Sequence, residues 1–551
     1  MLLEKIQKEN DIKQLKPEEL EKLAEEIRQF LVEKISVTGG HLASNLGVVE
    51  LTMALHLAFE LPQDKMIWDV GHQSYTHKIL TGRRAGFDDL RKYGGMSGFP
   101  KRKESECDAF DTGHSSTSIS AGLGYVAARD IKGEEHSVIS IIGDGAMTGG
   151  MAYEALNNAS RLKSNFIIVL NDNNMSISEN VGGMSRYLNG LRTAEAYTGL
   201  KKGVEDTLMK IPVQGEKILY QMKKTKSGLK QLFVPGMFFE DMGITYLGPV
   251  DGHDIRKLYK TFQEAKRVDH AVLVHVLTKK GKGYVPAEEN PSRFHGIVPF
   301  DIETGEAKEK SSKDSYTDIF SKVFCDIAKQ NDAVVGITAA MADGTGLARF
   351  ARMFPDRFFD VGIAEEHALT FAAGLAAGGL KPVVAVYSSF LQRAFDQTIH
   401  DVCLQNLPVM IAVDRAGLVG SDGETHQGLF DLSFLNMIPN MTILSPKNRW
   451  EMADMVRFCA DFQYPVALRY PRGAAYEGLS AFRTPIVYGK SEILYEEEDI
   501  AVIFVGHMAE LAVQVRDRLK EIGYHCSLIN ARFVKPLDTS SDKGSQTFCD
   551  D

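Results

Sequence analysis

The chain has 551 residues, 44% of them hydrophobic and 25% charged, which predicts three or four globular domains with sizeable cores. A net charge of −10, without a long basic run, speaks against a nucleic-acid partner. The six cysteines form no CxxC pair, so neither a disulfide framework nor a zinc site is expected, and a reducing, cytoplasmic compartment is indicated.

The N-terminal and most apolar segments predict no membrane association. Residues 1–16 are charged throughout and lack the apolar centre of a signal peptide. The longest apolar stretch, 371–387, is interrupted by two glycines and by Lys381-Pro382. It therefore predicts a buried helix followed by a strand rather than a membrane span.

Two apolar runs, 138–142 and 166–170, predict neighbouring buried strands with a helix at 151–161 between them. Each run ends in a polar triplet, GDG around Asp144 and NDN ending at Asn173. Open parallel sheets bind ligands at the carboxyl ends of their strands, and Mg²⁺ combines a few protein oxygens with water and phosphate oxygens. Either triplet alone is typical of a turn, but the pair resembles the thiamine-diphosphate motif and predicts a metal–diphosphate site. Asp172 is either a further ligand or a turn cap.

Alternating strands and helices along the whole chain predict an α/β protein built from parallel sheets with helices on both faces. A strand at 272–277 is followed by a Gly/Lys loop at 279–284, and the polar stretch 301–315 has the composition of a linker. Residues 180–240 lack clear strands and are interpreted as a mobile insertion. Further strands are expected at 333–337, 383–387, 409–413, 441–444, 501–505 and 527–530.

Glu365 is the candidate catalytic carboxylate of the second half of the chain. It follows a short predicted strand at 358–361 and opens the apolar helix 368–377. Considered alone, it would be expected to stabilise the helix N-terminus, where acidic side chains are favoured. In combination with the metal–diphosphate motif, a catalytic role is the better interpretation.

The chain resembles the 1-deoxy-D-xylulose-5-phosphate synthase family of transketolase-like thiamine enzymes over residues 1 to about 538. The resemblance rests on these stretches, in this order: GGHLAS at 39–44, WDVGHQ at 68–73, KILTGR at 78–83, TGHSST at 112–117, GDGA at 143–146, NDNNMS at 171–176, AEEH at 364–367, YSSFLQR at 387–393, DRAG at 414–417, DGETHQ at 422–427 and RYPR at 469–472.

This resemblance implies three doubly wound domains of transketolase type, the third incomplete. They would be a diphosphate- and Mg²⁺-binding domain at 1–310, a pyrimidine-binding domain at 316–490 and a partial C-terminal domain at 491–551. The family joins pyruvate to glyceraldehyde 3-phosphate with loss of carbon dioxide. Its product feeds the synthesis of isoprenoid precursors, thiamine and pyridoxal phosphate. Relatives are homodimers that hold the cofactor between the first and second domains of one chain.

The resemblance also implies site residues, with thiamine diphosphate and Mg²⁺ as cofactors. The metal ligands would be Asp144, Asn173 and the backbone carbonyl of Met175. The cofactor contacts would be His72, Gly113, His114, Ser115, Gly145, Ala146, Asn173, Tyr284 and Glu365, the last sharing a proton with the pyrimidine ring. His41, His72 and His426 would handle protons with help from Asp422. The phosphate of the acceptor would be held by Tyr387, Arg393, Arg415 and Arg472.

The last residues depart from the family pattern. After Asp538 the sequence loses apolar periodicity, so a truncated or altered C-terminus is expected, with Val502, Phe504 and Leu528 left without cover.

Other interpretations stay open at this stage. A transketolase or a pyruvate-dehydrogenase-like subunit would use the same cofactor, and a catalytically inactive cofactor-binding protein would bind it without turnover. A NAD-binding Rossmann protein is disfavoured, because no strand is followed by G-x-G-x-x-G and a later acidic residue.

Overall fold

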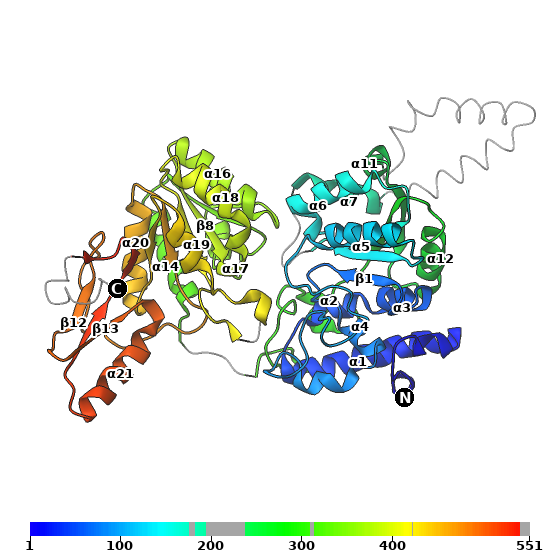
Figure 1. Cartoon of the computed structure of the whole chain (residues 1–551), viewed down its shortest axis with the longest axis horizontal. Helices are drawn as coiled ribbons and strands as arrows, with labels where there is room; N and C mark the ends of the chain where they lie inside the picture. Colours follow the sequence, from blue (N-terminus) through cyan, green and yellow to red (C-terminus); the bar gives the residue numbers. More distant parts are fainter. Residues whose placement is uncertain (176–181, 194–236, 309–312, 421–422, 540–551) are drawn as a thin grey trace, which may run out of the picture. The chain divides into compact units, whose positions relative to one another are not determined.

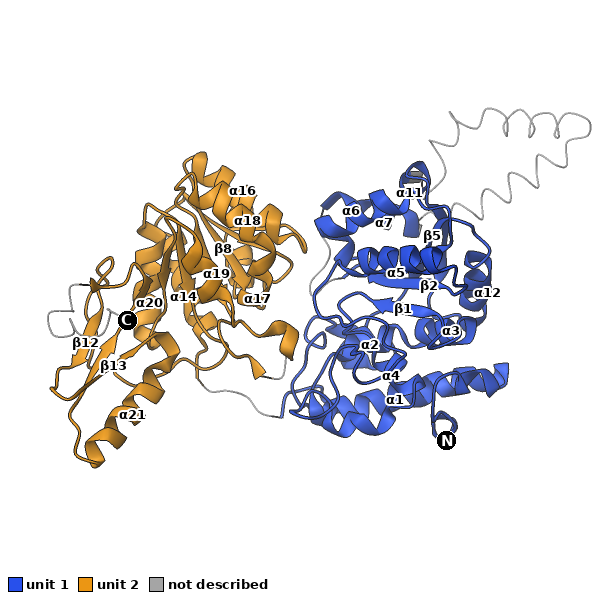
Figure 2. Ribbon diagram, in the orientation of Figure 1, with its two compact units in different colours: residues 1–309 blue, residues 310–551 orange. Residues whose placement is uncertain are grey.

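The computed structural model describes residues 1–175, 182–193, 237–308, 313–420 and 423–539. They belong to two compact units, residues 1–309 and 310–551 (Figure 2). Most of the predicted insertion at 180–240, and the C-terminal segment expected to be altered, lie outside the described residues.

The described part of unit 1 forms a five-stranded sheet in the order β1-β2-β3-β5-β4. All four neighbouring pairs are parallel. The strands predicted from apolar runs are confirmed as β2, β3 and β5, whereas β1 and β4 were not predicted. Their bounds are β1 Lys65–Trp68, β2 Val138–Gly143, β3 Phe166–Asp172, β4 Thr245–Asp251 and β5 Ala271–Leu277.

Helices cover both faces of this sheet because alternate strand residues enter two different cores (Figure 1). Ile139 and Ile141 of β2 pack with one set of helices, and Val138 and Ile142 pack with the other. The first set is α1 Leu20–Thr38, α2 Leu42–Gly47, α3 Val49–Ala58, α4 Tyr75–Leu80 and α12 Ile255–Ala265. The second is α5 Ser118–Lys132, α6 Gly150–Ala159, α7 Gly182–Thr193 and α11 Met237–Asp241.

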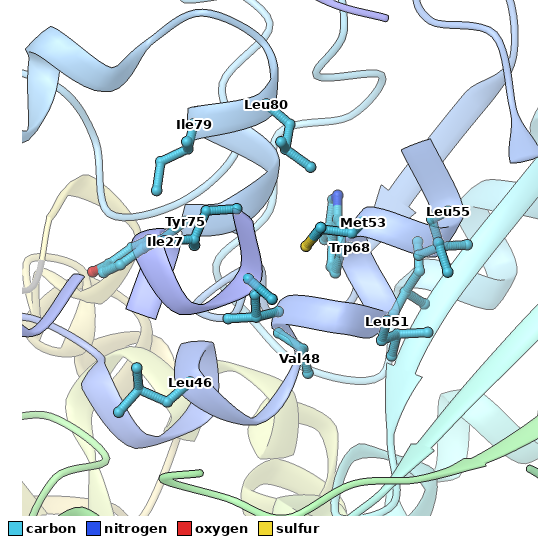
Figure 3. Packing of buried hydrophobic residues seen from close by; sticks show 14 of the residues in the cluster. Ile27, Leu46, Val48, Leu51, Met53, Leu55, Trp68, Tyr75, Ile79 and Leu80 are labelled. Carbon is cyan, nitrogen blue, oxygen red and sulfur yellow. The ribbon is translucent and has the colours of Figure 1, made fainter. Parts of the chain in front are cut away.

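The first core holds the helices that carry the N-terminal motifs. Figure 3 shows side chains from several of these elements in one core, among them Trp68 of β1, Met53 and Leu55 of α3, Tyr75 of α4 and Ile27 of α1. Trp68 and Tyr75 are almost completely buried. The loops before α2 and after β1 therefore start from rigidly packed elements.

Unit 2 has a seven-stranded sheet among its described residues, in the order β15-β10-β11-β9-β8-β6-β7. Its strands run parallel except β15, which pairs antiparallel with β10 at the edge. The predicted strands are confirmed as β6 to β10. The bounds are β6 Val334–Thr338, β7 Phe358–Asp360, β8 Lys381–Tyr387, β9 Met410–Asp414, β10 Thr442–Leu444, β11 Val466–Arg469 and β15 Phe533–Lys535.

The helices of unit 2 also lie on two faces. Val383 and Ala385 of β8 pack with α14 and α20, while Val384 and Val386 are buried on the alternate face, where α16 contacts β8. Helix α14 begins where the polar linker ends, because Ser315 and Asp318 form a reciprocal capping box. The helices are α14 Tyr316–Ala328, α15 Ala348–Met353, α16 Glu365–Ala377, α17 Ser388–Leu391, α18 Phe395–Gln397, α19 Asp431–Met437 and α20 Arg449–Asp461.

A small third sheet completes unit 2, and it corrects two expectations. It has the order β12-β14-β13 with α21 Ala509–Glu521 against it, and β12 is antiparallel, so the sheet is mixed rather than parallel. Phe504 and Leu528 were expected to lack cover, yet both are buried with residues of α21, and Val502 packs partly buried against them. The strands are β12 Glu492–Tyr495, β13 Ile500–Phe504 and β14 Cys526–Asn530.

The five cysteines within the described ranges are buried and form no disulfide. No helix in the described ranges of the chain has both the length and the apolar character needed to cross a membrane.

Candidate active site

The predicted metal ligands of unit 1 lie at the carboxyl ends of adjacent strands. Asp144 follows β2, and its amide continues the ladder by donating to the carbonyl of Asn171 over 3.1 Å. Asn173 and Met175 follow β3, and the amide of Met175 donates to the Asn173 side chain over 3.1 Å. Burial raises the pKa of Asp144 to about 6. Its Oδ1 is buried with no hydrogen-bond partner among the described residues, so this carboxylate fits a divalent cation.

The chemistry of this edge suits magnesium better than a transition metal. Within the described ranges, no group of three or more His, Cys, Asp or Glu side chains is arranged to hold a metal ion. One carboxylate, one amide and one backbone carbonyl are the sparse oxygen donors that Mg²⁺ uses when phosphate oxygens and water complete its shell.

Asp172 has partners of its own, which decides between its two interpretations. It accepts hydrogen bonds from Arg192 over 2.8 Å, from the amide of Asn174 over 3.2 Å, and contacts His275 Nε2 at 2.9 Å. The amide contact is that of a turn cap, and the other two fix its carboxylate. We therefore leave Asp172 out of the metal ligands.

Three histidines of unit 1 lie close together near the carboxyl ends of the strands in the five-stranded sheet. The ring centroids of His41 and His72 are 5.5 Å apart, and His295 lies 5.9 Å from the first and 5.0 Å from the second. His41 precedes α2, His72 follows β1, and His295 follows α13 (Val285–Glu289). The side-chain amide of Asn45 donates to the backbone carbonyls of both His41 and His72, which ties two of the three segments together.

A short antiparallel contact brings His41 beside His295. Gly40 and Ile297 exchange backbone hydrogen bonds of 2.8 and 2.9 Å. Gly39 has φ +70°, and a Cβ added there would lie 2.8 Å from the carbonyl of Ile297. Glycine is required at that position both for its conformation and for the close approach of the two chains.

His295 and Lys280 belong to this cluster, and sequence reasoning missed both. Lys280 Nζ lies 3.2 Å from His295 Nδ1, and Ser44 Oγ lies 3.5 Å from the same atom. Burial lowers the pKa of Lys280 to about 8 and lowers that of His295 further below its ordinary range. Their position in the sequence could have indicated both residues, because they follow β5. The carboxyl end of β5 lies at the same end of the sheet as Asp144.

The loop that carries Gly113, His114 and Ser115 is fixed by Asp69. This carboxylate, at the end of β1, accepts the amides of Ser116 and Ser118 over 2.7 and 3.0 Å. Ser116 Oγ in turn donates to the carbonyl of Ala146 over 2.8 Å. The predicted contacts Gly113, His114, Ser115, Gly145 and Ala146 are thus brought to one end of the sheet.

Tyr284 is placed differently from the other predicted contacts of unit 1. Its hydroxyl donates to the carbonyl of Ile302 over 2.7 Å, and its ring packs against Phe294 and Phe300. These contacts give it a structural role, and its contact with a cofactor stays a prediction.

In unit 2, Glu365 is the first residue of α16 and is only 2% exposed. Burial raises its pKa to about 7, while Arg393, 3.9 Å from Oε2, acts in the opposite direction. The N-cap of the helix is Ala364, and Oε2 of Glu365 has no hydrogen-bond partner in the described part of the chain. This oxygen is therefore available to an external donor, which favours the catalytic interpretation over a capping role alone.

Three of the four predicted phosphate ligands follow or end strands of unit 2, whereas Arg393 lies farther along the chain in the short helix η7 (Gln392–Ala394). Tyr387 ends β8, and the guanidinium of Arg415, just after β9, lies 4.0 Å from the centre of its ring. Arg415 is held by Asp414 at 3.0 Å and by the carbonyl of Gly344 at 2.6 Å. Arg472 follows β11 and is exposed. Arg415 is thus oriented by contacts with its neighbours, and Arg472 places a second guanidinium at the protein surface.

His426 falls on the segment between β9 and α19. His426 ends the short helix η10 (Glu424–His426), and its ring meets Phe390, which stacks on Tyr387. Asp422 lies outside the described residues. His426 is therefore linked through Phe390 to the tyrosine expected at the phosphate end.

Three family models match the chain in succession. They are 1-deoxy-D-xylulose-5-phosphate synthase over residues 3–278, the pyrimidine-binding domain of transketolase over 312–477, and the C-terminal domain of transketolase over 489–545. With the parallel sheet of unit 1 and the largely parallel seven-stranded sheet of unit 2, they define a transferase of the transketolase-like class, which uses thiamine diphosphate with Mg²⁺.

Relatives narrow the class to one family. The chain is 59% identical to the 1-deoxy-D-xylulose-5-phosphate synthase of Lachnoclostridium phytofermentans and 55% identical to that of Natranaerobius thermophilus. Both comparisons cover 98% of this chain and 86% of the relative. The chain belongs to the 1-deoxy-D-xylulose-5-phosphate synthase family.

A solved structure is similar as well. The transketolase of Campylobacter jejuni is 17% identical, with a TM-score of 0.40, and the comparison covers 96% of this chain and 90% of that one.

Proposed function

We propose that this chain joins pyruvate to D-glyceraldehyde 3-phosphate, releases carbon dioxide and forms 1-deoxy-D-xylulose 5-phosphate. The reaction is the first step toward isoprenoid precursors by the non-mevalonate route, and it also supplies the synthesis of thiamine and pyridoxal phosphate. Glu365 carries this proposal, because a buried carboxyl with a pKa of about 7, whose Oε2 accepts no hydrogen bond from the described residues, can share a proton with the pyrimidine of thiamine.

Each unit, taken by itself, carries side chains that suit one part of thiamine diphosphate. Asp144, Asn173 and the carbonyl of Met175 would hold Mg²⁺ and through it the diphosphate, and Glu365 would bind the pyrimidine. When bound, the cofactor supplies the electron sink that the decarboxylation of pyruvate requires. The protein contributes position, charge and proton transfer.

The remaining residues have complementary roles in this proposal. His41, His72 and His295 would hold or move protons at the reacting oxygens, since imidazole changes its charge near neutral pH. Lys280, next to His295, would add positive charge where negative charge develops. In unit 2, His426 would assist proton transfer, and Tyr387, Arg393, Arg415 and Arg472 would hold the phosphate of the aldehyde.

The direct test is a reaction with purified chain, thiamine diphosphate, Mg²⁺ and pyruvate, with and without glyceraldehyde 3-phosphate. Carbon dioxide and the mass of the product are followed. Aldehyde-dependent carbon dioxide with a pentulose phosphate product is expected. Carbon dioxide without a pentulose phosphate would favour a dehydrogenase-like subunit, and cofactor binding without any product would favour an inactive binding protein.

A matched pair of variants assigns the chemistry to Glu365. Glu365→Ala should reduce kcat by at least about a thousandfold, because it removes a group used in forming the reactive cofactor, while Mg²⁺ and diphosphate binding stay intact. Glu366→Ala, at the neighbouring position of the same helix, should retain most of the activity. Activity close to wild type in Glu365→Ala would contradict the assignment.

We also propose that the chain forms a homodimer, as the resemblance implies. Leu404, Leu418 and Met437 of unit 2 are large apolar side chains exposed by 69%, 75% and 72%. Burial of such side chains against a second copy would be favourable. Light scattering that gives the mass of a single chain at micromolar concentration would contradict the dimer.

A further inference from the structure

Helix α7 brings an arginine to the edge of the sheet where the metal ligands lie. Leu188 and Leu191 of α7 are buried in the core that also contains side chains of α6 and α11. They fix α7 against the rest of unit 1. Arg192 is the residue that follows Leu191. Its place is therefore set by apolar packing as well as by its own charge.

The guanidinium of Arg192 contacts both aspartates at this edge. Its Nε donates to Asp172 Oδ2 over 2.8 Å, and a terminal nitrogen forms an ion pair with Asp172 Oδ1. The same group lies 3.6 Å from Asp144 Oδ2. Both carboxylates are almost completely buried, so these charges interact with little screening by water.

A fixed positive charge at this place has opposite effects on the two groups expected to bind there. A divalent cation on Asp144 would lie within a few ångströms of the guanidinium, and the two cations would repel each other. A diphosphate carries negative charge that both cations attract. The arginine therefore opposes the metal ion alone and favours the metal ion together with diphosphate.

We propose that Arg192 makes metal binding at Asp144 conditional on diphosphate. The site takes up a bare divalent cation weakly and takes up the same cation strongly once a diphosphate group is present. The inference rests on the proposed metal role of Asp144 and extends it to a residue outside the two strand-end triplets.

The test measures binding by titration calorimetry, without any turnover. Mg²⁺ is titrated into the full chain, first alone and then with saturating inorganic diphosphate. Wild type is compared with Arg192→Gln and with Arg186→Gln, a matched control because Arg186 is an exposed arginine on the same helix.

Arg192→Gln should bind Mg²⁺ alone about tenfold more tightly, because the repulsive charge is gone. The gain should vanish or reverse in the presence of diphosphate, so the factor by which diphosphate strengthens Mg²⁺ binding should fall at least about tenfold. Arg186→Gln should behave as wild type, and Arg192→Lys should keep most of the coupling. Unchanged or weaker binding of Mg²⁺ alone in Arg192→Gln would overturn the inference.

Two further variants keep the outcomes distinct. Asp144→Asn should lose Mg²⁺ binding under both conditions, and if it does not, the metal site itself is wrongly assigned. If Arg192→Gln fails to fold because Asp172 is left buried without its partner, the double variant Arg192→Gln/Asp172→Asn carries the same test. An unchanged coupling factor in a folded double variant overturns the role of Arg192.

Discussion

At the scale of single residues, the ionisation of Glu365 connects stability with function. Its pKa is about 7 in the folded protein, against 4.5 for the ordinary side chain, because burial disfavours the charged form. Between these two pH values the folded protein keeps a proton that the unfolded chain releases. Stability therefore falls as pH rises from about 4.5 to about 7, and the loss is complete above that pH.

This argument predicts that Glu365→Gln stabilises the cofactor-free protein at alkaline pH. Glutamine has nearly the same shape and no charge, so the variant should gain up to roughly 3 kcal/mol over wild type at pH 8 and little at pH 4.5. Urea unfolding of both proteins across this pH range measures the difference. A gain that does not change with pH would mean that Glu365 ionises normally.

Arg472 leads to a second prediction at the same scale. Because its exposed guanidinium is expected to meet the aldehyde phosphate, Arg472→Ala should raise KM for glyceraldehyde 3-phosphate about tenfold or more. The release of carbon dioxide from pyruvate should change little. Steady-state kinetics with each substrate varied in turn separates the two effects. An unchanged KM would remove Arg472 from the acceptor site.

At the scale of elements, a buried network joins the third sheet to the second. Lys447 pairs with Glu492 of β12 and with Glu451 of α20, and Arg532, which precedes β15, pairs with the same two glutamates. All four side chains are at most 3% exposed. Each charge is compensated only while the whole network persists.

Arg532→Met should therefore destabilise unit 2 by about 3 to 5 kcal/mol, because it leaves two buried glutamates with a single lysine. Arg483→Met is the control. Arg483 pairs with Asp454 at the surface, and its loss should cost less than about 1 kcal/mol. Chemical denaturation of both variants compares the two values. Equal small effects would show that the network contributes little.

The elements also show which parts of this fold are predictable from sequence. Strands β2, β3 and β5 were found because buried parallel strands are continuous apolar runs. Asp144, Asn173 and Glu365 could be predicted as candidate site residues because motifs mark the ends of such strands. Strand β4 is only partly buried and β15 has three residues, so neither gives a clear apolar signal. His295 and Arg192 lie far along the chain from the residues they contact, and no local pattern reports such contacts.

At the scale of the whole molecule, each unit has its own hydrophobic cores, and the expected metal ligands belong to unit 1 alone. Mg²⁺ with inorganic diphosphate should therefore stabilise unit 1 selectively, by about 2.7 kcal/mol at a hundred times the dissociation constant. The two tryptophans report separately, since Trp68 lies in unit 1 and Trp450 in unit 2.

Thermal unfolding of Trp450→Phe, followed by the fluorescence of Trp68, should shift upward with these ligands. Unfolding of Trp68→Phe, followed by Trp450, should not shift. Equal shifts in both variants would show that the chain unfolds as a single cooperative body.

The edge strand β15 has a consequence for synthesis on the ribosome. Leu444 of β10 pairs with Phe533, and other strands of the same sheet are made long before that residue. At about 5 to 20 residues per second, the edge of the sheet stays open for several seconds after β10 has emerged. During that interval β10 presents unpaired backbone groups to its surroundings. The nascent chain is then most exposed to intermolecular pairing, and slower translation between residues 444 and 533 would lengthen that period.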